Sequence, residues 1–459
     1  MRKTRSRTTI VLMIALLVIL GVVVFMVRIV TNSNQWIQHS YNGHLSSNGG
    51  LASAGTIYDR NGIPLAYSED DLRLYNDDYT TRLSTLHVVG DDTLNISTAI
   101  QSSYRSNLIG FNYIWGLGLP ESLKHGNDIT LNIDVNACNS AYNALNGYNG
   151  AVVVYNYKTG EVMCSVSTPT YDPFDPPVIT EENEMQYDGV YVDKVLAGRY
   201  TPGSIFKVVT LASALQNIEG VEDEIFTCDG STMIGGEKIS CMHTHGEITM
   251  KDGLAQSCNI VFAELAERLG KSKMTATAEQ LGFNSSYTIN GTTTAQSTYI
   301  VNKANKNDLA WSGIGQYTLE TNPMHMAIMC GAIANGGSTA LPDEIKSGAV
   351  DLSFDNISGI TLMDSELASK LDEYMRYDVT SYYGDGLFPS LTVCAKTGTA
   401  EVGEGKEPHA WMIGYSQDED IPLAFAVVVE NGGYGYSTAG PVAVSAMEAC
   451  ASTLRAEAN

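Results

Sequence analysis

A single apolar run near the start of the chain limits what this chain can fold into. Residues 10–27 carry no charge, and they follow the basic residues Arg2, Lys3, Arg5 and Arg7. A run of about 18 apolar residues is long enough to cross the hydrocarbon core of a bilayer as a helix. Basic residues beside such a helix stay on the cytoplasmic side. We therefore expect the long remainder of the chain to fold outside the cytoplasm.

A cleaved signal peptide is the alternative explanation of this run. The run is long for a signal peptide, and Arg28-Ile29-Val30-Thr31 after it offers no small-residue cleavage site. An uncleaved single-pass anchor in the cell membrane is therefore favoured, with the N-terminus in the cytoplasm. The expected domains are a cytoplasmic basic tail (1–9), a transmembrane anchor (10–28), a stalk with a small pedestal domain (29–128) and a large domain (129–459).

Composition limits the partners that the exported part can bind. The chain has 459 residues, is 44% hydrophobic and carries a formal net charge of −24. This apolar content suffices for one large domain with a smaller one beside it. Because the surface is acidic, we expect no nucleic acid as partner and no anionic lipid beyond the anchor itself.

Strand patterns lie at both ends of the large domain, and helical patterns lie between them. Residues 151–155 and 162–166 alternate around Lys158-Thr159-Gly160, which predicts a β-hairpin. Further strands are expected at residues 391–400, 410–415 and 424–430. Residues 204–340 are expected to be mostly helical. The helices are expected at residues 208–216, 250–268, 324–334 and 439–454. This order favours an α/β fold of the α+β type, in which helices cover a five-stranded antiparallel sheet, without excluding another α+β topology.

A serine and a lysine three positions apart are the strongest chemical signal in the chain. Ser204 and Lys207 lie in the stretch Tyr200-Thr201-Pro202-Gly203-Ser204-Ile205-Phe206-Lys207. If a helix begins near Ser204, both side chains share one face, and the amine can take the proton of the hydroxyl. The field of a helix N-terminus also favours the alkoxide. The pair is therefore interpreted as a nucleophile and its base.

Two further short motifs follow in an order that has a known counterpart. Ser257-Cys258-Asn259 begins 53 residues after Ser204, and Lys396-Thr397-Gly398-Thr399 begins 139 residues after Ser257. Serine β-lactamases and penicillin-binding proteins share this set of three motifs. The chain therefore resembles the penicillin-binding protein transpeptidases, of the monofunctional class B kind. Residues 55–62, 196–204 and 312–316 also resemble that family.

The resemblance implies the family's α/β fold and a role for each motif. Ser204 would attack a carbonyl carbon, with Lys207 as the general base for acylation. Ser257 would relay a proton to the departing amine, and Asn259 would hold the substrate amide or Lys207. The backbone N–H groups of Ser204 and Thr399 would form the oxyanion hole.

The third motif would bind the substrate. Lys396, Thr397 and Thr399 would hold its terminal carboxylate, and Gly398 permits a close backbone approach. The charge of Lys396 would also lower the pKa of Lys207. In this family the substrate is the D-alanyl-D-alanine end of a peptidoglycan stem peptide, and β-lactams are covalent inhibitors. A polytopic membrane partner would polymerise the glycan, as in related proteins.

One position departs from the family pattern. The family usually has glycine after the glutamine at Gln316, whereas this chain has Tyr317. We interpret Gly315-Gln316 as structural support beneath the site.

Two other function classes stay open. A β-lactam-hydrolysing enzyme would use the same Ser204 but needs a second base to activate water, and no candidate for that base is identified. A β-lactam sensor or an inactive scaffold is the other possibility; a sensor would need several membrane spans or a cytoplasmic effector.

Eight cysteines are too few for a disulfide scaffold in a chain of this length. A bridge between Cys228 and Cys241 is possible in an oxidising exterior and is left open. Cys241, His243 and His245 lie close together, as metal ligands do, but no second tight ligand pair follows them. The sequence therefore predicts neither a metal nor a cofactor.

Overall fold

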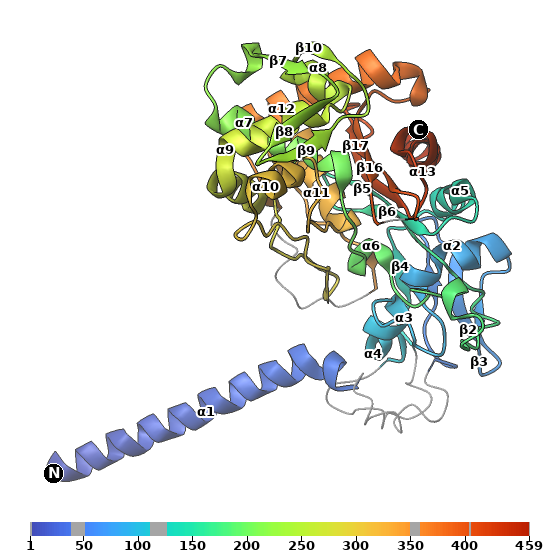
Figure 1. Ribbon diagram of the computed structural model, residues 1–459. Coiled ribbons are helices and arrows are strands. Elements are labelled where there is room, and N and C mark those ends of the chain that lie inside the picture. Colours follow the sequence, from blue (N-terminus) through green and yellow to red (C-terminus); the bar gives the residue numbers. More distant parts are fainter. Residues whose placement is uncertain (1, 38–50, 111–125, 349–358, 404, 459) are drawn as a thin grey trace.

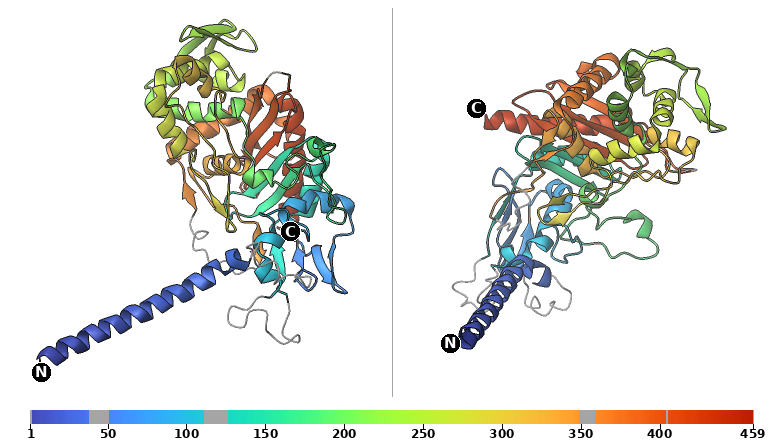
Figure 2. Two further views of the ribbon diagram at one scale, coloured as in Figure 1. Left: turned by 60° about the horizontal axis from the view of Figure 1, so that its bottom comes forward. Right: turned by 90° about the vertical axis from the view of Figure 1, so that its left-hand side faces the viewer.

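The computed structural model describes residues 2–37, 51–110, 126–348, 359–403 and 405–458. Residues 38–50 of the predicted stalk and 111–125 of the predicted pedestal domain lie outside these ranges. Helix α1 (Arg2–Ile37) projects away from the packed part of the molecule (Figures 1 and 2). It contains the span Ile10–Arg28, which is long and apolar enough to cross a membrane and has none of its residues buried.

The large domain is built on the predicted five-stranded antiparallel sheet, with strand order β16-β17-β18-β5-β6. Its strands are β5 (Gly150–Asn156), β6 (Val162–Thr168), β16 (Val393–Ala400), β17 (His409–Ser416) and β18 (Leu423–Val429). The predicted hairpin is β5 with β6. Every residue of β5, β6 and β18 is buried, as expected for strands covered on both faces.

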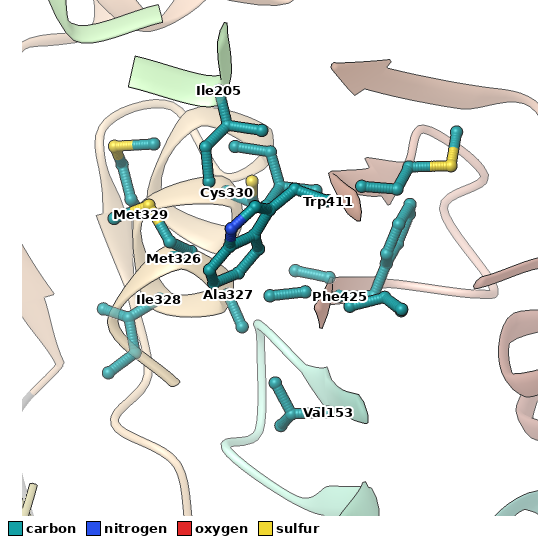
Figure 3. Packing of buried hydrophobic residues seen from close by; sticks show 14 of the residues in the cluster. Val153, Ile205, Met326, Ala327, Ile328, Met329, Cys330, Trp411 and Phe425 are labelled. Atoms are coloured by element: carbon teal, nitrogen blue, oxygen red, sulfur yellow. The ribbon is translucent and has the colours of Figure 1, made fainter. Parts of the chain in front are cut away.

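Helices cover both faces of this sheet. On one face α5 (Val135–Leu145) and α13 (Gly435–Glu457) pack together, and on the other lies α11 (Pro323–Ala334). Because successive side chains of a strand point to opposite faces, neighbours on β17 face different helices. Figure 3 shows Trp411 of β17 beside Met326 and Cys330 of α11. The predicted fold, helices on a five-stranded antiparallel sheet, is confirmed.

A second group of helices lies beside the sheet and carries part of the site. It comprises α7 (Lys207–Asn217), α8 (Met250–Ala255), α9 (Asn259–Gln280), α10 (Lys306–Gly313) and α12 (Ser365–Asp378). The single helix predicted at residues 250–268 is wrong, because the chain turns between α8 and α9. Ser257 there has φ 54°, and the N–H of Cys258 donates to the carbonyl of Gly253 at 2.7 Å. This is a left-handed helix end, and the apolar pattern continues across it.

Residues 225–249 form two nested antiparallel strand pairs, within a segment (204–340) that was expected to be mostly helical. Strand β7 (Ile225–Cys228) pairs with β10 (Gly246–Thr249), and β8 (Ser231–Ile234) pairs with β9 (Glu237–Ser240). Gly235-Gly236, both with positive φ, make the turn between β8 and β9. A Gly-Gly pair between short strands is a hairpin signal that the sequence analysis missed.

The small domain has its own five-stranded sheet, with strand order β14-β4-β1-β2-β3. Its strands are β1 (Ile57–Tyr58), β2 (Pro64–Glu69), β3 (Leu72–Tyr75), β4 (Ile129–Leu131) and β14 (Ile345–Ser347), and its helices are α2 (Tyr79–Val89), α3 (Ile100–Ser103) and α4 (Arg105–Leu108). Strand β14 returns to this sheet from far along the chain. The domain boundary at residue 129 stays a prediction. Short elements complete the fold: α6 (Lys194–Ala197), β11 (Thr288–Ile289), β12 (Thr292–Thr293), β13 (Ser338–Thr339) and β15 (Ile360–Thr361).

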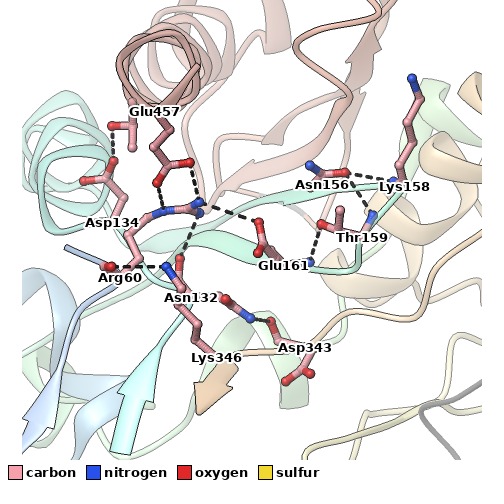
Figure 4. A network of polar contacts seen from close by, with 11 residues as sticks. Arg60, Asn132, Asp134, Asn156, Lys158, Thr159, Glu161, Asp343, Lys346 and Glu457 are labelled. Carbon is pink, nitrogen blue, oxygen red and sulfur yellow. Dashed lines mark hydrogen bonds and ion pairs between the residues drawn. The ribbon is translucent and has the colours of Figure 1, made fainter. Parts of the chain in front are cut away.

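Hydrogen bonds and ion pairs connect the small domain with the large one (Figure 4). The guanidinium of Arg60, which follows β1, lies 2.9 and 3.0 Å from the two carboxylate oxygens of Glu457 in α13. It also lies 3.6 Å from Glu161 in the β5–β6 connection. The side chain of Arg60 is buried, so the fork geometry of this ion pair holds α13 and the small domain in one arrangement.

Candidate active site

Ser204 lies in the short 3₁₀ helix η4 (Gly203–Phe206), which leads directly into α7. Side chains at positions i and i+3 eclipse one another in 3₁₀ geometry, so Ser204 and Lys207 share one face. Gly203 allows the backbone to enter η4 at this point. Its φ is 55°, and a Cβ there would lie 2.5 Å from the carbonyl oxygen of Thr399. The backbone before Ser204 therefore lies directly against β16.

Lys207 is completely buried and contacts the second motif through its amine. Its Nζ lies 2.6 Å from the carbonyl oxygen of Ser257, 3.1 Å from Ser257 Oγ and 2.8 Å from Asn259 Oδ1. Burial, and then the nearby charge of Lys396, lowers the pKa of Lys207 to about 7. An amine with such a pKa is neutral in a large share of molecules at neutral pH and can accept a proton.

The turn between α8 and α9 positions the second motif. Ser257 sits at the turn in left-handed conformation, and Asn259 begins α9. Besides accepting from Lys207, Asn259 donates through Nδ2 to the carbonyl of Ser240 at 3.0 Å. Both side chains are half-buried. The structure thus brings Lys207, Ser257 and Asn259 together around one amine.

The third motif occupies β16, an edge strand of the large sheet. Lys396 is fully buried, whereas Thr397 and Thr399 are half-buried. A Cβ at Gly398 would lie 3.0 Å from the carbonyl oxygen of Pro202 and from Ile205 Cγ2. Such contacts are tighter than most that a Cβ makes, so glycine here helps β16 lie close to η4, and the structure places the third motif beside Ser204, as expected.

Two residues near this motif carried no sequence signal. The hydroxyl of Tyr383 lies 2.9 Å from Thr397 Oγ1, accepts from the N–H of Thr397 at 3.1 Å, and lies 3.4 Å from Lys396 Nζ. Asp378 ends α12 and is fully buried, and within the described part of the chain neither of its oxygens has a hydrogen-bond partner. Burial raises the pKa of Asp378, although the charges of Lys396 and Lys207 act in the opposite direction. Both residues reach the site from a segment that has no motif of its own.

Gly315 supports η4 from beneath. The N–H of Gly203 donates to its carbonyl at 2.9 Å, and a Cβ at Gly315 would lie 1.9 Å from the carbonyl oxygen of Gly203. This contact agrees with the interpretation of Gly315-Gln316 as structural support. Tyr317, where the family usually has glycine, has φ 77°, a conformation that glycine adopts without strain.

Three cysteines and one histidine lie together next to this site. The sequence analysis found no second ligand pair for Cys241 and His245, but folding brings Cys228 and Cys258 to them. The lack of a second tight ligand pair in the sequence therefore does not exclude a group of four ligands in the fold. His243 lies outside the cluster, and all eight cysteines are free thiols.

With this geometry described, the family can be identified. Residues 150–448, well over half of the chain, match the sequence model of the penicillin binding protein transpeptidase domain. The chain belongs to the penicillin-binding protein transpeptidase family. The family predicted from the three motifs is thus confirmed, and its transpeptidase domain comprises both strand groups of the large sheet.

Several proteins of this family are similar to the chain. Peptidoglycan D,D-transpeptidase PbpA of Mycobacterium tuberculosis is 29% identical over 318 residues, which are 63% of this chain and 64% of that protein. Penicillin-binding protein 3 of Bacillus subtilis is 26% identical over 371 residues, 74% of this chain and 54% of that protein. The chain thus matches less than two thirds of the length of these curated relatives.

Solved structures of the family superpose over most of the chain. The D,D-transpeptidase domain of a peptidoglycan glycosyltransferase from Eggerthella lenta is 26% identical, with TM-score 0.74, and the match covers 87% of this chain and 98% of that one. The penicillin G acyl-enzyme complex of penicillin-binding protein A from M. tuberculosis is also 26% identical, with TM-score 0.72 and coverage of 87% and 99%.

Proposed function

We propose that this chain is a membrane-anchored D,D-transpeptidase that crosslinks peptidoglycan stem peptides through an acyl-enzyme on Ser204. One observation carries the proposal. The buried amine of Lys207 contacts Ser257 and Asn259, has a pKa lowered to about 7, and lies one 3₁₀ turn from Ser204. The curated relatives named peptidoglycan D,D-transpeptidase and the penicillin G acyl-enzyme complex of a similar structure support the same chemistry.

Acylation would begin at the penultimate residue of the stem peptide. Ser204 Oγ attacks the carbonyl carbon of the D-alanyl-D-alanine bond as its proton passes to Lys207. The backbone N–H groups of Ser204 and Thr399 hold the oxyanion. When the C–N bond breaks, the departing D-alanine takes a proton through Ser257, whose Oγ lies 3.1 Å from the amine of Lys207. The product is an ester on Ser204.

Deacylation would use the same groups in reverse. The amine of a neighbouring stem peptide attacks the ester and loses its proton to Lys207, and the C–O bond to Ser204 breaks as Oγ regains a proton. The new amide is the crosslink. A β-lactam would acylate Ser204 in the same way, but its leaving amine stays tethered to the acyl group, so the ester persists.

The third motif, on β16, would recognise the terminal carboxylate of the stem peptide or of a β-lactam. Lys396 supplies a buried positive charge, and the half-buried hydroxyls of Thr397 and Thr399 supply hydrogen bonds. Tyr383 acts as a positioning residue, since its hydroxyl contacts Thr397 and Lys396 together.

The anchor would hold this site outside the cytoplasm, with the N-terminus inside. Basic residues precede the apolar span, which supports this orientation. A polytopic polymerase in the membrane would supply the glycan strands.

Labelling of the full-length chain in detergent with a fluorescent penicillin tests the function. We expect a stable adduct that a peptic digest and mass spectrometry locate on Ser204, and Ser204→Ala should abolish it. Ser257→Ala is the matched serine variant, and it should still be labelled on Ser204, more slowly by about tenfold or more. An adduct on Ser257 would contradict the proposal. Turnover of many penicillin molecules per second would indicate a β-lactam-hydrolysing enzyme instead.

A further inference from the structure

Three cysteine sulfurs and one histidine nitrogen lie close together beside the second motif. They come from segments that the strand pairs of residues 225–249 bring together. Cys228 ends β7, Cys241 follows β9, His245 precedes β10, and Cys258 precedes the first residue of α9. Their ligand atoms all lie within 4.8 Å of one another. Cys228 and Cys258 are buried, and Cys241 and His245 are half-buried, so the cluster lies under the surface.

Three of the six separations between ligand atoms agree with the edges of a tetrahedron around one zinc ion. Bond lengths of about 2.3 Å to sulfur and about 2.0 Å to nitrogen imply edges of about 3.8 Å between sulfurs and about 3.5 Å between sulfur and nitrogen. Cys241 Sγ lies 3.9 Å from Cys258 Sγ. His245 Nδ1 lies 3.3 Å from Cys228 Sγ and 3.7 Å from Cys241 Sγ.

A disulfide explains this arrangement less well. A bridge needs two sulfur atoms about 2.05 Å apart. It would not explain why the third thiol and the imidazole lie beside them. All four cluster residues instead present a ligand atom to one point. Three thiols with one imidazole form a common structural zinc set, and four protein ligands leave no open position for catalysis.

The geometry points to a structural Zn²⁺ site formed by Cys228, Cys241, His245 and Cys258. On binding, the three thiols release their protons to solvent as Zn–S bonds form, and neutral His245 binds through the lone pair of Nδ1. Nothing is oxidised or reduced. Zinc at this site goes beyond the transpeptidase function and does not depend on it.

The zinc would hold the second motif in place. Cys258 stands between Ser257 and Asn259, so a bond at its sulfur restrains both neighbours. The N–H of Asn259 donates to Cys241 Sγ at 3.3 Å, and its Nδ2 donates to the carbonyl of Ser240 at 3.0 Å. The first of these bonds ends on a ligand sulfur, and hydrogen bonds to metal ligands orient the groups around a site. The ion thereby ties the Lys207 contacts to the hairpin segment.

Metal analysis of the full-length chain, purified without chelator, tests this site. We expect about one zinc per chain in the parent protein. His245→Gln and Cys241→Ser should lose it, whereas His243→Gln, two positions away and outside the cluster, should retain it. We also expect acylation by penicillin to slow by about tenfold in the His245→Gln variant and to stay unchanged in the His243→Gln variant.

A second measurement needs no variant and covers the case in which the substitutions prevent folding. The parent chain is stripped of metal with a chelator under reducing conditions and titrated with Co²⁺, which should give the visible absorption of a tetrahedral cobalt thiolate that Zn²⁺ abolishes. Absence of zinc together with absence of this spectrum would overturn the proposal. So would zinc that persists in both ligand variants, or a disulfide within the cluster in chain alkylated directly from cells. If the purified parent chain lacks both zinc and this spectrum while penicillin still labels Ser204, the metal site is refuted and the transpeptidase function stands.

Discussion

At the scale of single residues, the site contains two buried lysines whose surroundings differ. Lys207 contacts the second motif, and Lys396 contacts Tyr383 and the carbonyl of Thr397. Burial lowers the pKa of Lys207, and the charge of Lys396 lowers it further. Lys207 is therefore suited to accept a proton, and Lys396 is placed to bind an anion.

Substitution should separate these two roles. Lys207→Ala removes the base, so acylation should slow by about a thousandfold for every substrate. Lys396→Ala removes a carboxylate contact, so it should slow acylation by a carboxylated β-lactam far more than acylation by its neutral ester. The rates of both variants with both compounds, measured by mass spectrometry, check this. Equal slowing in Lys396→Ala together with no slowing in Lys207→Ala would refute the assignment.

The pH dependence of acylation should follow the amine of Lys207. The neutral amine is the base, so the rate should rise with pH through the pKa of about 7 and level off above it. Below that value the rate should fall by about tenfold per pH unit. Charges at Cys258, Cys241 and Asp378 raise this pKa, and Lys396 lowers it. Lys396→Ala should therefore move the midpoint of the rate profile to higher pH, and a midpoint that stays in place would contradict the proposed coupling.

At the scale of secondary-structure elements, the site depends on the close packing of η4 against β16. Glycines stand at both contact points. An added Cβ would lie 2.5 Å from the nearest atom at Gly203 and 3.0 Å from the nearest atoms at Gly398. Close packing of this kind allows backbone groups of two distant elements to face one carbonyl of the substrate.

A pair of glycine substitutions should measure how much this packing matters. Gly203→Ala puts a Cβ 2.5 Å from the carbonyl of Thr399, which should displace Ser204 and slow acylation by about a hundredfold. Gly220 is the matched control, because its φ is also positive, at 73°, and nothing lies within 4 Å of an added Cβ. Gly220→Ala should lower the free energy of unfolding by about 1 kcal/mol and leave acylation intact. Equal acylation rates in the two variants would show that the close packing is unimportant.

At the scale of the whole molecule, the two domains act as one unit beside a separate helix. Strand β14 and the Arg60–Glu457 ion pair join the small domain to the large one, whereas α1 buries none of its apolar span. An exposed run of this length is stable only where something apolar surrounds it, and a bilayer meets that requirement.

Protease added to intact cells with permeable walls should reveal the orientation. A tag at the C-terminus should be digested, and a tag before the apolar span should survive, because the basic flank stays inside. Both tags should disappear when detergent opens the membrane, which controls for tag accessibility. Survival of the C-terminal tag in intact cells would reverse the proposed topology and separate the site from its substrate.

The sequence by itself determined the features that depend on short spacing. The Ser204–Lys207 pair and the β5–β6 hairpin follow from the periods of helix and strand, which fix neighbours a few residues apart. The apolar span follows from length and hydropathy, and the three motifs in order indicate the family. Helices and strands of the large sheet were predictable because each buries an apolar pattern of its own.

Only the tertiary structure decided which distant side chains meet. Tyr383 contacts Lys396, and Asp378 lies within the influence of its charge, because α12 and the π-helical residues Val379–Tyr383 after it pack against β16. No local pattern marks either residue. Cys228 and Cys258 are 30 residues apart, and they meet because two hairpins and the left-handed turn at Ser257 fold the chain back on itself. Contacts of this kind depend on how whole elements pack, and a one-dimensional pattern encodes the elements but not their packing.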